Sequence, residues 1–253
     1  MPHDWPSEPE LVPYVAQETL PLRHLLVLAP HPDDEVLGCG GLIASTLRAG
    51  AAVTVVVASD GAQAGDAATR QAESRAAARV LAGDGPQPDL HFWGLPDRGL
   101  ADDATLVPRL QHLLGSGEAD GVLLPSPFEV HPDHRALCLG ALLAARSTAC
   151  AAELWCYEIG QPLLADVLID ITAVLPIKRA ALQCFASQLA AQAYDEQLLA
   201  LNRYRAYTLG PKVSHAEALQ HLPRDRWQSG LDDVIGAVGA RLHRRFGGGT
   251  ADR

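Results

Sequence analysis

Two short stretches of the sequence combine imidazole and carboxylate side chains in the same order. The first is HPDDE at residues 31–35, and the second is HPDH at residues 131–134. Imidazole nitrogens and carboxylate oxygens are common protein ligands of Zn²⁺, and the same groups act as general acids and bases. These stretches are therefore the candidate reactive groups of the chain.

The first stretch has an ordinary structural explanation, which is the start of a helix. Proline at the first helical position and acids in the first turn are favoured there. This explanation does not account for His31, because histidine is not a favoured N-cap residue. The second stretch repeats the pattern after another apolar run. Two such coincidences are much less expected than one, so a shared function is the better hypothesis.

The chain around these motifs alternates between apolar, β-branched runs and Ala/Leu/Arg-rich helical patterns. The runs predict strands at 25–29, 53–58, 90–93 and 122–125, with helices at 36–48, 67–82 and 104–114 between them. This order predicts βαβ units in an α/β fold with a mostly parallel sheet and helices on both faces. Each motif then begins where a strand ends, at the edge where open α/β sheets bind ligands.

The rest of the chain follows a different pattern, within one predicted domain spanning residues 1–253. Two further strands are expected at 153–160 and 166–172, near the sheet edge, and long helices at 175–190 and 196–207. Residues 246–253 are expected to form a flexible tail. The glycine-rich segment 38–44 lies inside the first predicted helix, so it favours close helix–sheet packing over a dinucleotide loop.

A metal site is the chemistry that the two motifs favour. Residues three apart on a first helical turn lie on one face, which pairs His31 with Asp34 and His131 with His134. A catalytic zinc site uses three protein ligands and leaves one position open. His31, Asp34 and one of the two later histidines supply such a set. The remaining histidine and Asp33 are then an oxyanion partner and a base.

Composition limits the classes of partner. Apolar residues make up 48% of the 253-residue chain, charged residues make up 20%, and the formal charge is −10. This charge argues against a nucleic-acid backbone or an anionic membrane surface, and no apolar run approaches the ~20 residues of a membrane span. A small-molecule substrate remains, with a homo-oligomer left open.

The cysteines indicate the compartment. There are five of them, an odd number without CxxC pairing and in apolar contexts, which argues against a disulfide framework. The first residues have neither the basic nor the apolar region of a signal peptide. A cytoplasmic protein is therefore predicted.

The motifs APHPDDE and HPDH, about a hundred residues apart, resemble the PIG-L/LmbE-like N-acetylglucosamine deacetylases. The segments 69–83, 94–100 and 178–188 resemble that family's Arg-x-x-Glu helix, Leu-Pro-Asp loop and Lys-to-Ser-Gln helix. The resemblance thus covers roughly residues 24–190, and it implies a Rossmann-like fold and a zinc cofactor. SDGAQAG at 59–65 departs from the family's Gly-Glu pair, so the substrate contacts of that loop do not carry over.

The resemblance also implies roles for individual residues. It gives His31, Asp34 and His134 as zinc ligands and Asp33 as the general base. His131, in its imidazolium form, would stabilise the oxyanion.

Two further roles come from matched positions. Asp133 would orient His131. Arg70, on the Arg-x-x-Glu helix, would contact the substrate, although an exposed helical arginine explains that position equally well.

The predicted activity is removal of acetyl from an N-acetylated amino sugar of N-acetylglucosamine type, giving acetate and a free amine. The alternatives are hydrolysis of another small-molecule amide, or sugar binding at a metal domain without catalysis. A His₂Asp set also occurs in non-haem iron oxygenases, but an α/β sheet disfavours that class.

Overall fold

The computed structural model describes residues 8, 12–230 and 234, and these build one mixed sheet between two layers of helices. The strands are β1 (His24–Ala29), β2 (Ala52–Ser59), β3 (Asp89–Leu95), β4 (Gly121–Pro125), β5 (Glu153–Tyr157), β6 (Val167–Asp170) and β7 (Ala216–Leu222). Their order across the seven-stranded sheet is β3-β2-β1-β4-β5-β7-β6. The tail predicted at 246–253 lies outside the described residues.

Strands β1 to β5 are parallel, and β7 is antiparallel to both of its neighbours. The prediction of a mostly parallel α/β sheet is therefore confirmed. Strands β1 and β4 are neighbours, with Leu25 opposite Gly121 and Val27 opposite Leu123. The carboxyl ends of these two strands thus lie side by side, as the motifs require.

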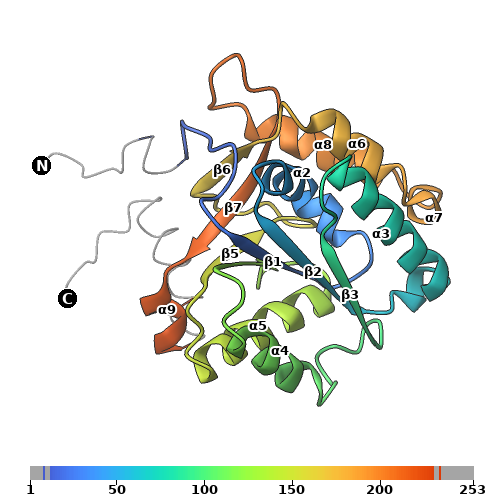
Figure 1. Ribbon diagram of the computed structural model, residues 1–253, viewed down its shortest axis with the longest axis vertical. Coiled ribbons are helices and arrows are strands. Elements are labelled where there is room, and N and C mark those ends of the chain that lie inside the picture. The colour runs from blue at the N-terminus through green and yellow to red at the C-terminus, as the bar shows by residue number, and fades with distance from the viewer. Residues whose placement is uncertain (1–7, 9–11, 231–233, 235–253) are drawn as a thin grey trace, which may run out of the picture.

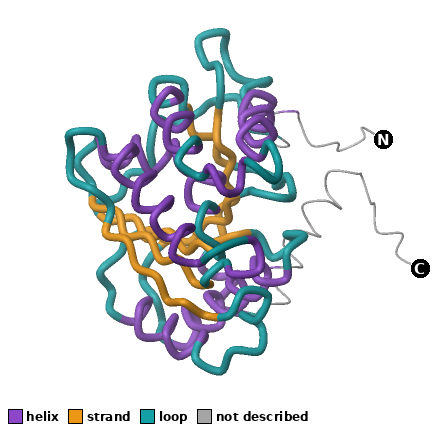
Figure 2. The backbone as a smooth tube through the Cα atoms, turned by 90° about the vertical axis from the view of Figure 1, so that its right-hand side faces the viewer, coloured by secondary structure: helices purple, strands orange, loops and turns teal. Residues whose placement is uncertain are grey.

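The helices cover both faces of the sheet, as Figures 1 and 2 show. One face carries α2 (Asp34–Arg48), α3 (Ala67–Ala82), α6 (Leu175–Leu182) and α8 (Tyr194–Arg205), and the other carries α4 (Leu106–Gly115) and α5 (Pro132–Ser147). The short helices α7 (Ala186–Leu189) and α9 (Arg224–Ser229) and the 3₁₀ turn η1 (Ala62–Ala64) complete the described elements.

Each helix layer buries its own apolar core. Because side chains alternate along a strand, Leu25 and Val27 pack into the cluster beneath α2 and α3, whereas Leu26 and Leu28 pack beneath α4 and α5. All four side chains are buried, which explains why the sequence of β1 is continuously apolar. In the part of the chain that the structure describes, no helix is long and apolar enough to cross a membrane.

The glycine-rich segment packs closely against the sheet. A Cβ atom added at Gly38 would overlap the Tyr157 ring, and one added at Gly41 would overlap the Ile171 side chain. Helix α2 is also broken at Cys39, whose φ of −141° is not helical. The prediction of close helix–sheet packing at this segment is thus supported by its geometry.

A buried ion pair caps the break in α2. Glu217 accepts hydrogen bonds from the Gly41 and Leu42 amides, while Lys178 Nζ donates to the Leu37 carbonyl. Lys178 and Glu217 are 2.7 Å apart and fully buried. The backbone groups released by the break therefore have partners from α6 and β7.

Three expectations for the second half of the chain were wrong. Strand β7 lies in a segment for which no strand was predicted. It separates β5 from β6, so of these two predicted strands only β6 lies at an edge of the sheet, and β3 forms the other edge. The helix expected at 175–190 is two helices, because the chain leaves helical geometry between α6 and α7. The strand expected at 153–160 is present as β5, but it ends at Tyr157.

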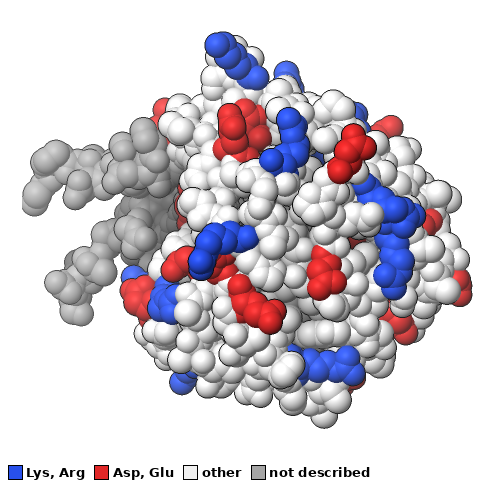
Figure 3. All heavy atoms as spheres, viewed as in Figure 1, with Lys and Arg blue, Asp and Glu red and all other residues white. Residues whose placement is uncertain are grey.

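Charged side chains on the face shown in Figure 3 are interspersed in sign. Separate groups of basic and acidic side chains are scattered over this face, most of which is formed by uncharged residues.

Candidate active site and metal centre

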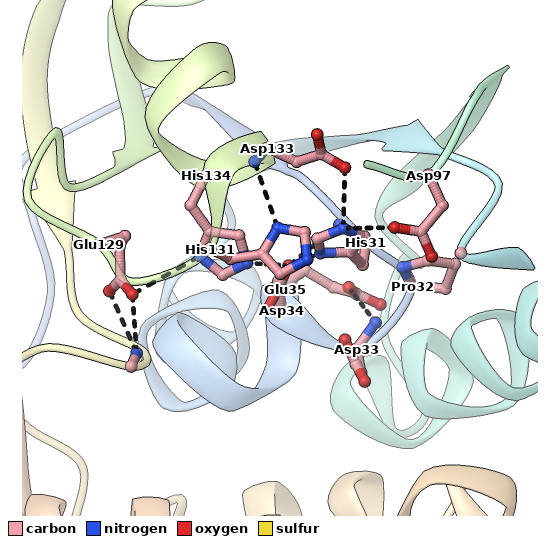
Figure 4. Close-up of polar contacts among 12 residues, drawn as sticks. His31, Pro32, Asp33, Asp34, Glu35, Asp97, Glu129, His131, Asp133 and His134 are labelled. Atoms are coloured by element: carbon pink, nitrogen blue, oxygen red, sulfur yellow. Dashed lines mark hydrogen bonds and ion pairs between the residues drawn. The ribbon is translucent and has the colours of Figure 1, made fainter. Parts of the chain in front are cut away.

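The two motifs meet at the carboxyl edge of the sheet (Figure 4). His31 and Asp33 lie between β1 and α2, and Asp34 is the first residue of α2. His131 is the N-cap of α5, and His134 lies in its first turn. The rings of His31, His131 and His134 have centroids 4.5 to 5.4 Å apart. Folding therefore brings together residues that are separated by about a hundred positions.

One carboxylate oxygen joins two of the imidazoles. Asp34 Oδ2 lies 3.1 Å from His31 Nδ1 and 3.2 Å from His134 Nε2. The same oxygen accepts a hydrogen bond from the His31 backbone amide at 3.0 Å. All three side chains are buried. The set His31, Asp34 and His134 thus presents two ring nitrogens and one oxygen toward one point.

The far nitrogens of these two rings face other carboxylates. His31 Nε2 lies 3.3 Å from both Asp97 Oδ1 and Asp133 Oδ2, and His134 Nδ1 lies 3.7 Å from Glu129 Oε2. Burial lowers the pKa of His31, but hydrogen bonds to Asp133, Asp34 and Asp97 outweigh this and raise it well above its ordinary value. The pocket floor therefore attracts positive charge.

Asp133 does not contact His131 in the way the resemblance implies. Its carboxylate accepts hydrogen bonds from the Arg98 and Leu100 amides at 2.6 and 3.2 Å and faces His31. Its backbone amide, rather than its carboxylate, donates to His131 Nδ1 at 3.2 Å. Orientation of His131 by the Asp133 side chain stays a prediction, and the contact present here is made by the main chain.

His131 therefore serves as the N-cap of α5, with an imidazole nitrogen in place of the usual side-chain oxygen. Because Nδ1 accepts a hydrogen bond, the ring proton of the neutral form sits on Nε2. Burial, together with the nearby charge of His31, lowers the pKa of His131 below its ordinary value. The expected imidazolium form is thus disfavoured near neutral pH, and a neutral Nε2–H donor is favoured.

Asp33 is held in an unusual backbone conformation beside the cluster. Its φ of 134° is rare for a residue with a side chain. The Glu35 carboxylate accepts a hydrogen bond from its amide at 3.0 Å, and Arg70 Nη2 donates to its Oδ2 at 3.0 Å. Burial and the nearby Asp34 charge raise the pKa of Asp33 well above its ordinary value, although Arg70 opposes this. A carboxyl group with a raised pKa suits proton transfer near neutral pH.

Arg70 is buried rather than exposed on α3, so the alternative of an exposed surface arginine was wrong. Its guanidinium donates to the carbonyl oxygens of Gly61 and Pro32 as well as to Asp33. The nearest partners of Arg70 are therefore this chain's own groups. Direct contact with a substrate stays a prediction.

A pocket of about 580 Å³ opens over these residues. Its polar wall includes Gln63, Gln188, Gln192 and Gln197, and its apolar wall includes Leu37, Ile159, Leu198 and Leu201. Gln188 donates to the Ala64 carbonyl at 3.1 Å, and its neighbour Ser187 donates to Glu73 on α3 at 2.6 Å. The segments that resemble the family's Arg-x-x-Glu and Ser-Gln helices are thus joined at this pocket.

The sequence pattern was not sufficient to assign Asp97 to the site, and Glu129 was missed altogether. Asp97 follows β3 at the same sheet edge, and this position was a signal, but an aspartate after proline is also ordinary turn chemistry. Glu129 lies in the loop before the second motif, and no spacing pattern marks it. Both residues complete contacts that only the folded chain creates.

The donor set fits a zinc ion. Imidazole nitrogens and a carboxylate oxygen are zinc ligands, and three protein ligands leave a position open. Metal-bound histidines usually direct their second nitrogen to a carboxylate or carbonyl group. His31 and His134 both face carboxylates in this way, while His134 Nδ1 is buried without a hydrogen-bond partner. One ring nitrogen from each of His31, His131 and His134 also lies within 4.8 Å of the other two.

The comparisons agree with this fold and with the family resemblance of the two motifs. The model of the PIG-L family, described as GlcNAc-PI de-N-acetylase, matches residues 26–145 and confirms the resemblance carried by the two motifs. The matched segment contains every residue of both motifs. Comparison with curated proteins gives no match.

Solved structures share the fold over most of their length. The conserved protein TT1542 from Thermus thermophilus is 29% identical with a TM-score of 0.69, over 80% of this chain and 95% of that one. An N,N'-diacetylchitobiose deacetylase from Pyrococcus horikoshii is 21% identical with a TM-score of 0.67, over 80% and 85% of the two chains.

A third similar structure belongs to a protein with different chemistry. GalB, the 4-carboxy-2-hydroxymuconate hydratase from Pseudomonas putida KT2440, is 25% identical with a TM-score of 0.66, over 80% of this chain and 97% of that one. The fold therefore does not by itself identify the reaction, which must be argued from the site.

Proposed function

We propose that this chain is a zinc-dependent hydrolase that removes acetyl from an N-acetylated amino sugar, giving acetate and a free amine. The observation that carries the proposal is the position of Asp34 Oδ2, within 3.2 Å of nitrogens from both motifs. The match to the de-N-acetylase family supports the reaction class. His31, Asp34 and His134 would hold the ion.

When bound, Zn²⁺ would lower the pKa of water toward ~7 and polarise the acetyl carbonyl. The remaining steps fall to side chains. Asp33 accepts the proton of the attacking water and later delivers it to the leaving amine. Its raised pKa supports both steps, because a proton accepted near neutral pH is then retained until the amine departs.

His131 acts on the developing oxyanion. Its Nε2–H group donates a hydrogen bond to the carbonyl oxygen as negative charge builds up there. The N-cap contact between Nδ1 and the Asp133 amide fixes both the ring orientation and the tautomer. Arg70 orients the Asp33 carboxyl group through the hydrogen bond that it donates to Oδ2.

The pocket walls support a sugar as substrate. Glutamine side chains offer amide donors and acceptors to hydroxyl groups, and Leu198 and Leu201 offer an apolar surface to the C–H face of a sugar ring. Another small-molecule amide is the alternative within the same reaction class. The five free cysteines support the prediction of a cytoplasmic enzyme.

The test is release of acetate from a panel of N-acetylglucosamine conjugates by the purified full chain. We expect acetate and free amine in equal amounts, loss of the reaction with a chelator, and its return with added zinc. Full activity in the chelated protein would contradict zinc dependence. A zinc-loaded chain that releases no acetate would favour the non-catalytic binding alternative.

The similarity to GalB supplies a further arm of the same experiment. Hydration of an unsaturated carboxylic acid without acetate release would replace the deacetylase proposal with a hydratase. Aerobic turnover that requires iron and a 2-oxoacid would favour the oxygenase alternative. Neither result is expected, because Asp33 and His131 together suit attack by water on an amide carbonyl.

A further inference from the structure

Glu129 is a buried carboxylate that connects the second motif to a wall of the pocket. It lies in the loop between β4 and α5 and is 2% exposed. Its Oε1 accepts hydrogen bonds from the Ile159 and Gly160 amides at 3.0 and 3.1 Å. Arg135 fixes the loop by donating to the Glu129 and Val130 carbonyl oxygens. Ile159 and Gly160 in turn line the pocket.

The approach of this carboxylate requires the glycine at position 160. A Cβ atom added there would lie 2.8 Å from Glu129 Oε2, which is closer than real Cβ contacts. The carboxylate is buried and already hydrogen bonded, so it has little freedom to move aside. Gly160 and Glu129 therefore form a matched pair.

The other partner of Glu129 is the ring of His134. Glu129 Oε2 lies 3.7 Å from His134 Nδ1, as the dashed contact in Figure 4 shows. His134 Nδ1 is buried and has no hydrogen-bond partner, so this carboxylate is the acceptor placed to take a hydrogen bond from Nδ1–H. A small shift of either side chain brings the two atoms into hydrogen-bond range.

The position of that proton decides what the opposite nitrogen can do. A neutral imidazole carries one proton, and the nitrogen without it is the one that binds a metal. His134 Nε2 is the atom that faces Asp34. It can act as a ligand only when the proton is on Nδ1. Without an ion, Asp34 Oδ2 is the closer acceptor and lies at Nε2, whereas an ion held by Asp34 and Nε2 leaves the Glu129 carboxylate as the acceptor for Nδ1–H.

We propose that Glu129 is a positioning residue of the metal site, which accepts a hydrogen bond from His134 Nδ1–H when Nε2 binds the ion and ties that ligand to the pocket wall at residues 159–161. This inference rests on the proposed zinc function for its role, but its geometry does not depend on the ion. Glu129 would orient the ring of His134 in the same way that Asp97 and Asp133 orient the ring of His31.

The decisive variant is Glu129→Gln. Its amide oxygen can still accept from the Ile159 and Gly160 amides, but its amide hydrogens would donate to His134 Nδ1. The proton of His134 would then move to Nε2, the nitrogen required for the ion. We expect the zinc dissociation constant of the full chain to rise about 10–100-fold.

A spectroscopic measurement on the zinc-loaded full chain tests the contact directly. With Nε2 on the ion, the His134 proton is on Nδ1, and in ¹⁵N-resolved NMR spectra we expect the signal of a hydrogen-bonded Nδ1–H in the parent and its loss in Glu129→Gln. This readout also separates the two proposals. A parent with this hydrogen bond and no deacetylation would contradict the proposed function alone.

The matched control is Glu158→Gln. Glu158 is equally buried beside the same loop, but its partners are Arg205 and the Leu163 amide rather than a histidine. We expect this variant to bind zinc like the parent. Equal losses of zinc affinity in the two variants would overturn the proposal, because both would then report only general damage to the loop.

Gly160→Ala gives a second test that leaves Glu129 in place. The added methyl group would displace the carboxylate from His134, so we expect weaker zinc binding and loss of the Nδ1–H hydrogen bond in the zinc-loaded chain. Parent-like zinc affinity and an unchanged Nδ1–H hydrogen bond in both Gly160→Ala and Glu129→Gln would overturn the assignment.

Discussion

Arg70 Nη2 lies 3.0 Å from Asp33 Oδ2, although the two residues are 37 positions apart in the sequence. Both side chains are buried, and two more acceptors, the carbonyl oxygens of Gly61 and Pro32, fix the guanidinium. The hydrogen bonds of Arg70 thus go to the proposed base and to two backbone carbonyl groups. Its effect on catalysis is expected to pass through the position and the charge of Asp33.

Replacing Arg70 with alanine should therefore lower kcat more than it changes KM, by about 10²-fold for a misplaced catalytic group. The positive charge of Arg70 lowers the pKa of Asp33, so its removal should shift the acidic limb of the pH–rate profile to higher pH. Zinc content should not change. Arg75→Ala, an exposed arginine on the same helix, is the control. A raised KM with unchanged kcat and pH profile would instead support direct contact with substrate.

Asp33→Asn should remove the proposed base while keeping its shape. Asparagine cannot accept the proton of water, so we expect a rate loss of ~10²–10⁴-fold. Zinc should remain bound, because His31, Asp34 and His134 are untouched. The measurement is acetate release alongside metal analysis. Turnover close to that of the parent would remove the base on which the proposed mechanism depends.

His131→Ala should keep zinc and lower the rate by roughly 10²–10³-fold, because one donor to the oxyanion is lost. The lowered pKa of His131 implies that its neutral form is already populated at pH 7. The parent should therefore lose no activity between pH 7 and 9 through this residue. Loss of zinc from His131→Ala but not from His134→Ala would reverse the roles of the two histidines.

Glu35→Gln tests the stability cost of a buried acid. Burial raises the pKa of Glu35 from 4.5 to about 7. The folded chain thus holds a proton that the unfolded chain releases, so the free energy of unfolding should fall as pH rises from 4.5 to 7 and stay low above it. The expected loss is up to about 3 kcal/mol. Urea denaturation at pH 5 and 8 should show a smaller difference in Glu35→Gln than in the parent. Equal differences would contradict the assignment.

Lys178→Met should destabilise the fold without touching the pocket. The change leaves Glu217 as an unpaired buried carboxylate, which typically lowers the free energy of unfolding by about 3–5 kcal/mol. Urea denaturation provides the measurement, and Lys212→Met, at an exposed lysine, is the control. A variant as stable as the parent would show that the ion pair is not needed to cap the break in α2.

The first half of the fold could be predicted closely because its sequence pattern and its burial agree. The predicted helix at 67–82 has the bounds of α3, and the four predicted strands lie within β1 to β4. Strand β7 could not be found in this way. Its sequence, AEALQHL, contains good helix formers and a glutamate. Glu217 is tolerated in a buried strand only because Lys178 and two backbone amides meet it.

The site was predictable in its residues more than in its contacts. Spacing correctly suggested that His31 and Asp34 point together, but not for the stated reason. His31 precedes α2, and the pairing arises because the Asp34 carboxylate turns back to the His31 amide and ring. Asp97 lies where a site residue is expected, at the end of a strand, but its contact with His31 depends on the folded chain. Glu129 depends entirely on contacts between distant elements, so no local pattern identifies it.

The strand order also has a consequence for how the nascent chain can fold during synthesis. Both motifs belong to the first five strands, which pair with one another without the C-terminal segment. Strand β6 pairs with β7, a strand made about fifty residues later, so it lacks that neighbour until residues 216–222 have also left the ribosome. We expect the two motifs to meet before the sheet is complete. Lys178 then remains without its ion-pair partner until Glu217 is added with β7. The break in α2 is therefore the last part of the site's scaffold to gain its hydrogen bonds.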